Sequence, residues 1–111
     1  MTDSMADRRG AARYALIVLA EVTELSSGTK LNARTSDMSR TGCYIDTLQP
    51  FPKGSSVHVL FAYRGETVQM NATVAYVNAN LGMGVHFKEA ISEDQWAVLD
   101  RWLQRATHLP V

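Results

Sequence analysis

The sequence predicts a mainly β fold, with a six-stranded antiparallel β-barrel, a C-terminal α-helix and a flexible N-terminal arm. Three observations support this class. Short runs of aliphatic, β-branched and aromatic residues alternate with polar ones, turn-forming residues mark tight connections between the runs, and a helical pattern occurs only near the end of the chain. We expect a closed barrel because closure removes the unpaired strand edges that a small open sheet would expose.

The chain has the size and composition of one small globular domain. It has 111 residues, of which 46% are hydrophobic and 20% charged, and its formal net charge is zero. We divide it into a flexible arm over residues 1–13, a barrel with its helix over residues 14–106, and a tail over residues 107–111 that we expect to be frayed. Cys43 is the single cysteine, so no internal disulfide can form, and its apolar neighbours predict core packing.

The first half of the barrel follows from three segments. A β-rich run from Tyr14 to Thr23 predicts the first strand, and Ser26-Ser27-Gly28 supplies the turn after it. A second strand is expected to approach Asp37. The segment from Gly42 to Leu48 predicts a further strand, which prolines then end.

The second half shows the clearest alternation of apolar and polar residues. The run from Val57 to Tyr63 predicts a strand, and Arg64-Gly65-Glu66 predicts a hairpin turn. The run from Val68 to Tyr76 alternates so regularly that one of its faces should lie in the core and the other in solvent. This register favours core packing for Tyr76.

The helix is predicted near the end of the chain. Ser92 has the position of an N-cap, and Gln95 completes a capping-box spacing. One apolar stripe at helical spacing should lie against the barrel, and it consists of Trp96, Leu99, Trp102, Leu103 and Ala106. We expect a monomer, because the stripe is used within the chain.

Two polar motifs stand out from this framework. Arg9 and Arg13 have the spacing R-x-x-x-R, and Asp37, Ser39 and Gly42 have the spacing D-x-S-x-x-G, which is the more specific of the two. Arginine forks match phosphate oxygens and the O6/N7 edge of guanine, and a carboxylate accepts hydrogen bonds from the N–H edge of guanine. Together the motifs predict a receptor for a guanine dinucleotide.

With these motifs, the sequence resembles a PilZ domain, the bacterial receptor family for cyclic di-GMP, over nearly the whole chain. The run from Gly82 to Phe87 resembles the closing strand of the family, and Ser92 to Leu103 resembles the helix that follows it. Thr41 departs from the pattern, since many members carry a second glycine there. The resemblance implies a PilZ-type barrel.

The resemblance also implies roles for the motif residues. Arg9 and Arg13 would grip guanine Hoogsteen edges and phosphates, while Asp37 and Ser39 would contact guanine or phosphate from the barrel side. Gly42 would let the backbone approach closely where a Cβ would obstruct. On binding, the N-terminal arm would fold over the ligand and become ordered.

Two further residues are weaker candidates for ligand contact. Arg8 supplies an additional guanidinium, so the ligand is expected as one molecule or a stacked pair; the alternative is that Arg8 lies in solvent. Tyr76 offers an aromatic face for a guanine, although core packing is favoured. The motif residues themselves have a structural alternative, as solvated arginines and as turn residues that bond their own backbone.

The sequence does not indicate an enzyme. His58, His86 and His108 lack the short spacing of metal ligands, and Cys43 has no identifiable base partner. We therefore predict no metal and no cofactor, and a ligand that is held rather than cut.

The function predicted is a cyclic di-GMP receptor and adaptor that signals to an unidentified downstream protein. The alternative is a PilZ-like interaction module that acts without nucleotide. A small-barrel binder of DNA or RNA is disfavoured by the neutral charge. No run is apolar enough for a signal peptide or a membrane span, so we expect a cytoplasmic protein without membrane insertion. The resemblance implies outputs such as motility, surface attachment with biofilm formation, exopolysaccharide production or virulence.

Overall fold

The computed structural model describes residues 12–108, which contain eight strands and one helix. In chain order the elements are β1 (Tyr14–Ala15), β2 (Leu19–Glu24), β3 (Lys30–Met38), β4 (Gly42–Asp46), β5 (Ser56–Tyr63), β6 (Glu66–Asn78), β7 (Gly82–Ala90), α2 (Glu93–Gln104) and β8 (Thr107–His108).

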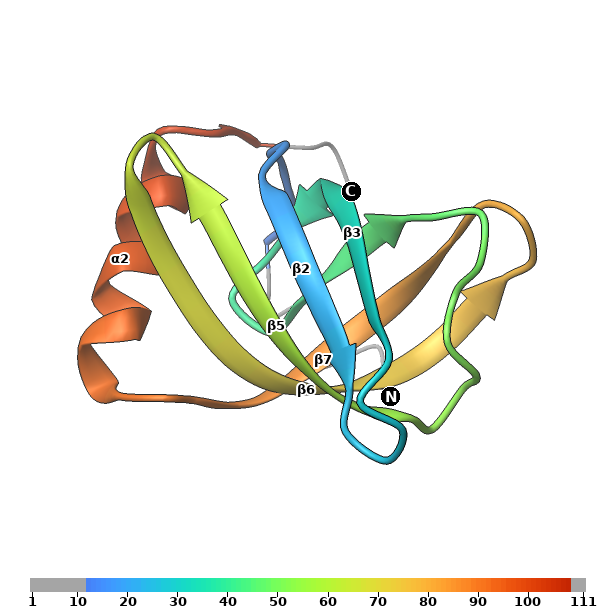
Figure 1. Cartoon of the computed structure of the whole chain (residues 1–111). Coiled ribbons are helices and arrows are strands. Elements are labelled where there is room, and N and C mark those ends of the chain that lie inside the picture. The colour runs from blue at the N-terminus through green and yellow to red at the C-terminus, as the bar shows by residue number, and fades with distance from the viewer. Residues whose placement is uncertain (1–11, 109–111) are drawn as a thin grey trace, which may run out of the picture.

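Six of the strands in the described part of the chain close a barrel. They are hydrogen-bonded in the order β2, β5, β6, β7, β4 and β3, and β3 pairs with β2 to complete the circle, with every pairing antiparallel (Figure 1). The predicted six-stranded antiparallel barrel with a C-terminal helix is thus confirmed. Outside this circle, β1 pairs with β3 and β8 pairs with β1. No helix within residues 12–108 is long and apolar enough to cross a membrane.

The first predicted strand is interrupted in the structure. Between β1 and β2 the chain leaves the ladder, with Leu16 and Val18 buried and Ile17 exposed. The fully buried hydroxyl of Thr35 bridges this break, since it donates to the Leu16 carbonyl at 2.7 Å and accepts from the Val18 N–H at 3.0 Å. A single strand from Tyr14 to Thr23 was therefore a wrong prediction, because Thr35 takes over the hydrogen bonds that a continuous ladder would supply.

This break gives β3 two partners along one edge. Residues Lys30 to Arg34 of β3 pair with β2, whereas Asp37 and Met38 pair with β1. The pairing of β3 with β4 has a register shift between Thr35 and Asp37, at the same level as the break. Bulges of this kind bend a strand and re-aim its side chains.

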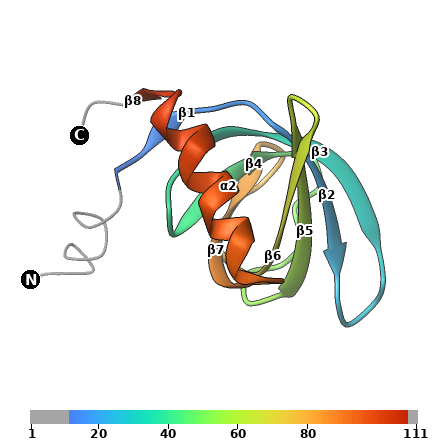
Figure 2. The ribbon, with the colours of Figure 1, turned by 90° about the vertical axis from the view of Figure 1, so that its left-hand side faces the viewer.

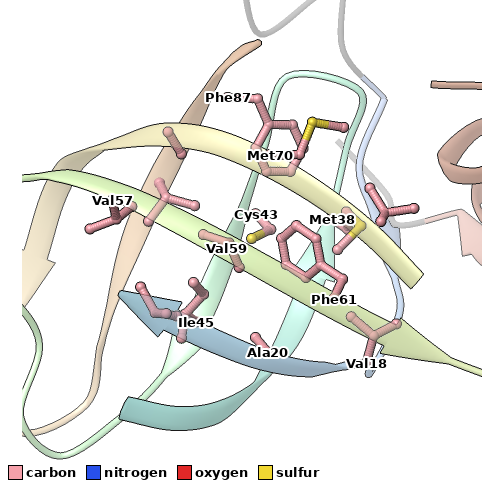
Figure 3. Close-up of a cluster of buried hydrophobic side chains, with 14 of the residues drawn as sticks. Val18, Ala20, Met38, Cys43, Ile45, Val57, Val59, Phe61, Met70 and Phe87 are labelled. Atoms are coloured by element: carbon pink, nitrogen blue, oxygen red, sulfur yellow. The ribbon is translucent and has the colours of Figure 1, made fainter. Parts of the chain in front are cut away.

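The core lies inside the barrel and is built from alternating positions of its strands (Figure 3). In β5 the inward positions are Val57, Val59 and Phe61, all fully buried. Phe61 meets Phe87 of β7 edge to face, with ring centroids 5.9 Å apart. Cys43 is buried in the same cluster, as predicted.

Helix α2 packs against β6 and β7 (Figure 2). Leu99, Trp102 and Leu103 form its buried face. Glu66, in the hairpin between β5 and β6, accepts a hydrogen bond from the Trp102 indole N–H at 3.0 Å and pairs with Arg101. These contacts combine burial with charge-assisted bonding at the C-terminal half of the helix.

The predicted capping box is wrong. Ser92 has the N-cap position, but its hydroxyl donates to the carboxylate of Asp94 and accepts no capping hydrogen bond from the helix backbone. The side-chain oxygen of Gln95 accepts from the backbone N–H of Gln69 in β6 at 2.7 Å. The Asp94 carboxylate and the Gln69 N–H thus take the two side chains that would otherwise form the capping box.

The C-terminal tail takes part in the sheet at its first two residues. Thr107 and His108, which we expected to be frayed, form β8 and pair with Ala15 and Tyr14 of β1. The partner strand lies far away in the sequence, so a local pattern could not indicate this pairing.

We predict that Thr35→Val destabilises the fold by about 2 kcal/mol or more, because it leaves the Leu16 carbonyl and the Val18 N–H buried without their partner. Thr35→Ser keeps the hydroxyl and should cost about 1 kcal/mol for the lost methyl group. Urea unfolding of both variants measures the difference. Equal losses would show that the hydroxyl does not hold the break.

We predict that Glu66→Gln lowers the stability of the fold at neutral pH but not in acid. The indole N–H of Trp102, with Arg101, lowers the pKa of Glu66 from 4.5 in the folded protein. A lowered folded pKa means that the carboxylate stabilises the fold above pH 4.5 and that this contribution is lost as the pH falls through the folded pKa. In thermal unfolding, the melting temperature of the variant should lie below that of the wild type at pH 7, and the two should converge in acid. A difference that persists unchanged in acid would contradict the prediction.

Candidate functional site

The pairing of β1 with β3 brings the two polar motifs together. Ala15 lies opposite Asp37 in the ladder, and Arg13, two residues earlier, forms an ion pair with Asp37 through Nη2 and Oδ2. The side chain of Arg13 is 62% exposed and that of Asp37 is 18% exposed. The remaining guanidinium donors of Arg13 therefore face solvent beside a partly buried carboxylate.

Ser39 organises the turn between β3 and β4. Its hydroxyl accepts hydrogen bonds from the N–H groups of Thr41 at 3.1 Å and Gly42 at 3.2 Å, and its own N–H donates to the Gly42 carbonyl at 2.8 Å. The Ser39 side chain is buried. The motif serine therefore builds the turn, as in the structural alternative raised from the sequence.

Gly42 lies where β4 comes close to the backbone of β7. A Cβ at this position would come within 2.2 Å of the Val85 carbonyl oxygen, a backbone atom that cannot move aside. The glycine is needed for this close approach of two strands, which places the turn against β7.

A hollow of about 220 Å³ opens at this corner of the barrel. The predicted site residues that line it are Arg13, Asp37, Ser39, Gly42 and Tyr76. Arg8 and Arg9 lie outside the described residues. Four residues of the two motifs, far apart in the sequence, thus face one surface.

Tyr76 does not pack in the core, which corrects the interpretation of its alternating register. Its side chain is 50% exposed, because a register shift between Val74 and Tyr76 in the pairing of β6 with β7 interrupts the alternation. The ring lies over Gly84, where a Cβ would come within 2.2 Å of the ring. Partial burial and the nearby carboxylate of Asp37 raise the pKa of Tyr76.

Sequence reasoning missed two further residues near the hollow. Tyr44 places its ring centroid 6.1 Å from that of Tyr76, and its hydroxyl accepts a hydrogen bond from the Asn78 amide at 3.0 Å. His86 is exposed on β7 and lines the hollow. The alternate glycines of Gly82-Met83-Gly84 were an available signal, because two outward positions without side chains leave room for the tyrosine rings.

The side chains around the hollow suit a planar anionic ligand. Exposed guanidinium donors, a carboxylate acceptor and an aromatic ring lie within one hollow. Burial, with a smaller effect of Asp37, raises the pKa of the Cys43 thiol and keeps it protonated. Within residues 12–108, no group of three or more His, Cys, Asp or Glu side chains is placed to hold a metal ion.

We predict that Gly42→Ala destabilises the protein by about 2 to 3 kcal/mol, since its Cβ forces β4 away from β7. Gly84→Ala should cost less than about 1 kcal/mol, because the Tyr76 ring can swing into solvent. Chemical denaturation of the two variants tests this order. A Gly84→Ala loss as large as that of Gly42→Ala would contradict it.

Comparison with solved structures supports the fold. The structure of the inhibitor of motility MotI/DgrA from Bacillus subtilis matches with a TM-score of 0.71 and 16% identity; the match covers 88% of this chain but only 50% of that one. The PilZ domain of CeSA from a cellulose synthesizing bacterium matches with a TM-score of 0.65 and 16% identity, covering 83% of this chain and 94% of that one.

No curated protein matches this chain in sequence. The sequence model of the PilZ domain, however, matches residues 7–105, which include both motifs, the closed barrel and the helix. The chain therefore belongs to the PilZ domain family.

Proposed function

We propose that this domain is a cytoplasmic receptor for cyclic di-GMP and an adaptor that passes its ligand state to a protein partner. The observation that carries the proposal is the placement of Arg13 beside Asp37 at the rim of one hollow. A cationic fork and an anionic acceptor side by side match the two edges of a guanine with its neighbouring phosphate.

The arginines are the phosphate and Hoogsteen ligands in this proposal. Arg13 keeps exposed donors while it bonds Asp37. Arg9 lies four residues earlier in the sequence, and four residues span at most about 14 Å, so an arm that folds over the hollow would bring Arg9 to the same ligand as Arg13. Arg8 extends the same cationic segment and would allow a stacked pair of ligands as well as a single one.

The barrel side supplies the acceptor, the shape and the stacking surface. Asp37 would accept from the guanine N–H edge. Ser39 and Gly42 would act mainly by holding the turn against β7, with the Ser39 oxygen as an additional polar contact. Tyr76, half exposed over Gly84, would stack on a base.

The output follows from ordering of the arm over the ligand, which would create or hide a surface for a partner. PilZ domains are binding and adaptor modules rather than enzymes, and a monomer of this size is sufficient for such a role. The similarity to an inhibitor of motility makes motility one candidate output, beside biofilm formation and exopolysaccharide production.

One observation favours the second candidate, an interaction module without nucleotide. Arg13 and Asp37 already form an ion pair with each other in the structure. A ligand that binds the pair therefore gains less binding free energy than it would from neutralising two unpaired charges.

We predict saturable binding of cyclic di-GMP, measured by calorimetric titration. Arg9→Ala, Arg13→Ala and Asp37→Asn should each weaken it about tenfold or more, because each removes a charge-assisted hydrogen bond. Linear guanine dinucleotide and cyclic di-AMP should bind more weakly than cyclic di-GMP, and the stoichiometry distinguishes one ligand molecule from a stacked pair.

Matched controls come from the same strands. Arg34→Ala and Asp46→Asn change the same residue types at opposed positions in the ladder of β3 and β4, outside the hollow, and should leave the affinity unchanged. Absence of binding heat and of NMR shifts in the folded wild type would reject the receptor and leave the nucleotide-independent module. Equal losses in the control variants would reject the assigned site.

A further inference from the structure

Arg40 connects the turn of the D-x-S-x-x-G motif with helix α2. It lies between Ser39 and Thr41, which line the hollow, but its own side chain leaves in the direction of the helix. Its Nε donates to Oδ1 of Asp100 at 3.1 Å, and its guanidinium carbon lies 4.8 Å from the ring centroid of Trp96. The turn therefore has one side on the hollow and another on the helix.

The two partners of Arg40 share one face of α2. Trp96 and Asp100 are four residues apart, which places them on successive turns of the same helix face. Figure 2 shows the turn between β3 and β4 beside the helix, in agreement with the contacts of Arg40 with Trp96 and Asp100. One guanidinium thus engages an aromatic face and a carboxylate of the helix at the same time.

We propose that Arg40 is a positioning residue that couples occupancy of the hollow to the packing of α2. The inference rests on the proposed function, because it names how the ligand site is read elsewhere on the domain. Arg40 lies within the motif but is not among the proposed ligand contacts. Through Arg40, ligand binding would change the surroundings of the Trp96 ring on α2.

The turn is built to move as a unit. The Ser39 hydroxyl binds the N–H groups of Thr41 and Gly42, so the backbone on both sides of Arg40 is tied to one side chain. The Thr41 carbonyl in turn accepts from the Phe87 N–H of β7 at 2.8 Å. A ligand that shifts or stiffens the hollow side of this turn must act on the position of Arg40.

The contacts of Arg40 are of a strength that a ligand can alter. The side chains of Arg40 and Asp100 are 53% and 43% exposed, and exposed ion pairs and cation–π contacts are weak. The helix remains anchored without them through its buried Leu99, Trp102 and Leu103. Loss of the Arg40 contacts should therefore change the coupling and leave the fold intact.

The experiment compares Arg40→Gln with Arg101→Gln. Both variants remove an exposed arginine–carboxylate pair of α2, but the partner of Arg101 is Glu66 at the β5–β6 hairpin, whereas Arg40 belongs to the motif turn. The first readout is the affinity for cyclic di-GMP by calorimetry. The second is the indole N–H resonance of Trp96 by NMR during the same titration.

In the wild type, the Trp96 resonance should shift on binding. Arg40→Gln should abolish this shift and weaken binding about threefold to fivefold, because coupling between two sites is reciprocal. Arg101→Gln should leave affinity and shift unchanged. A merely structural role would lower the melting temperature of Arg40→Gln while the Trp96 shift persisted, and that result would overturn the proposal.

A second experiment, done without nucleotide, separates this proposal from the proposed receptor function. Asp100→Asn changes only the helix end of the contact, and it should raise the hydrogen exchange of the Thr41 and Gly42 amides about threefold if the turn and the helix are coupled. If cyclic di-GMP does not bind the wild type, the proposed receptor fails, and the exchange result alone decides the coupling. Unchanged exchange at both amides would refute it.

Discussion

The hydroxyl of Thr35 is the interaction on which the rest of the architecture depends. It lets the chain leave the ladder between Leu16 and Val18 while the buried Leu16 carbonyl and Val18 N–H keep a hydrogen-bond partner. Because of that interruption, β3 pairs with β2 to close the barrel and with β1 to extend past it. The second pairing carries Arg13 to Asp37, so one buried hydrogen-bonded side chain closes the fold and assembles the candidate site.

The site itself is made as much by absence of side chains as by their presence. Gly42 lets β4 meet β7, and Gly84 leaves space that the Tyr76 ring occupies. Ser39 directs its hydroxyl to its own turn, so the motif specifies a backbone shape before it offers contacts to a ligand. A short motif of this kind is sensitive to backbone geometry because small shifts move every group on the turn together.

Helix α2 joins the domain by two kinds of contact with different consequences. Its buried residues, led by Trp102 with Glu66, stabilise the fold. Its contacts with Arg40 are exposed and weak, and they reach the motif turn. The stability of the helix packing therefore resides in its buried side chains, and the proposed coupling to the motif turn resides in exposed ones, so the exposed contacts can change while the domain stays folded.

The sequence by itself determined the class of fold, the helix and the two motifs, because apolar alternation, turn residues and helical spacing are local properties. Val68 to Val74 follow the predicted register for this reason. Only the tertiary structure decided the break before Val18, the exposure of Tyr76, the use of Gln95 by a strand and the pairing of β8 with β1. Each of these depends on a bulge or on a partner distant in the chain, and local periodicity carries no information about either.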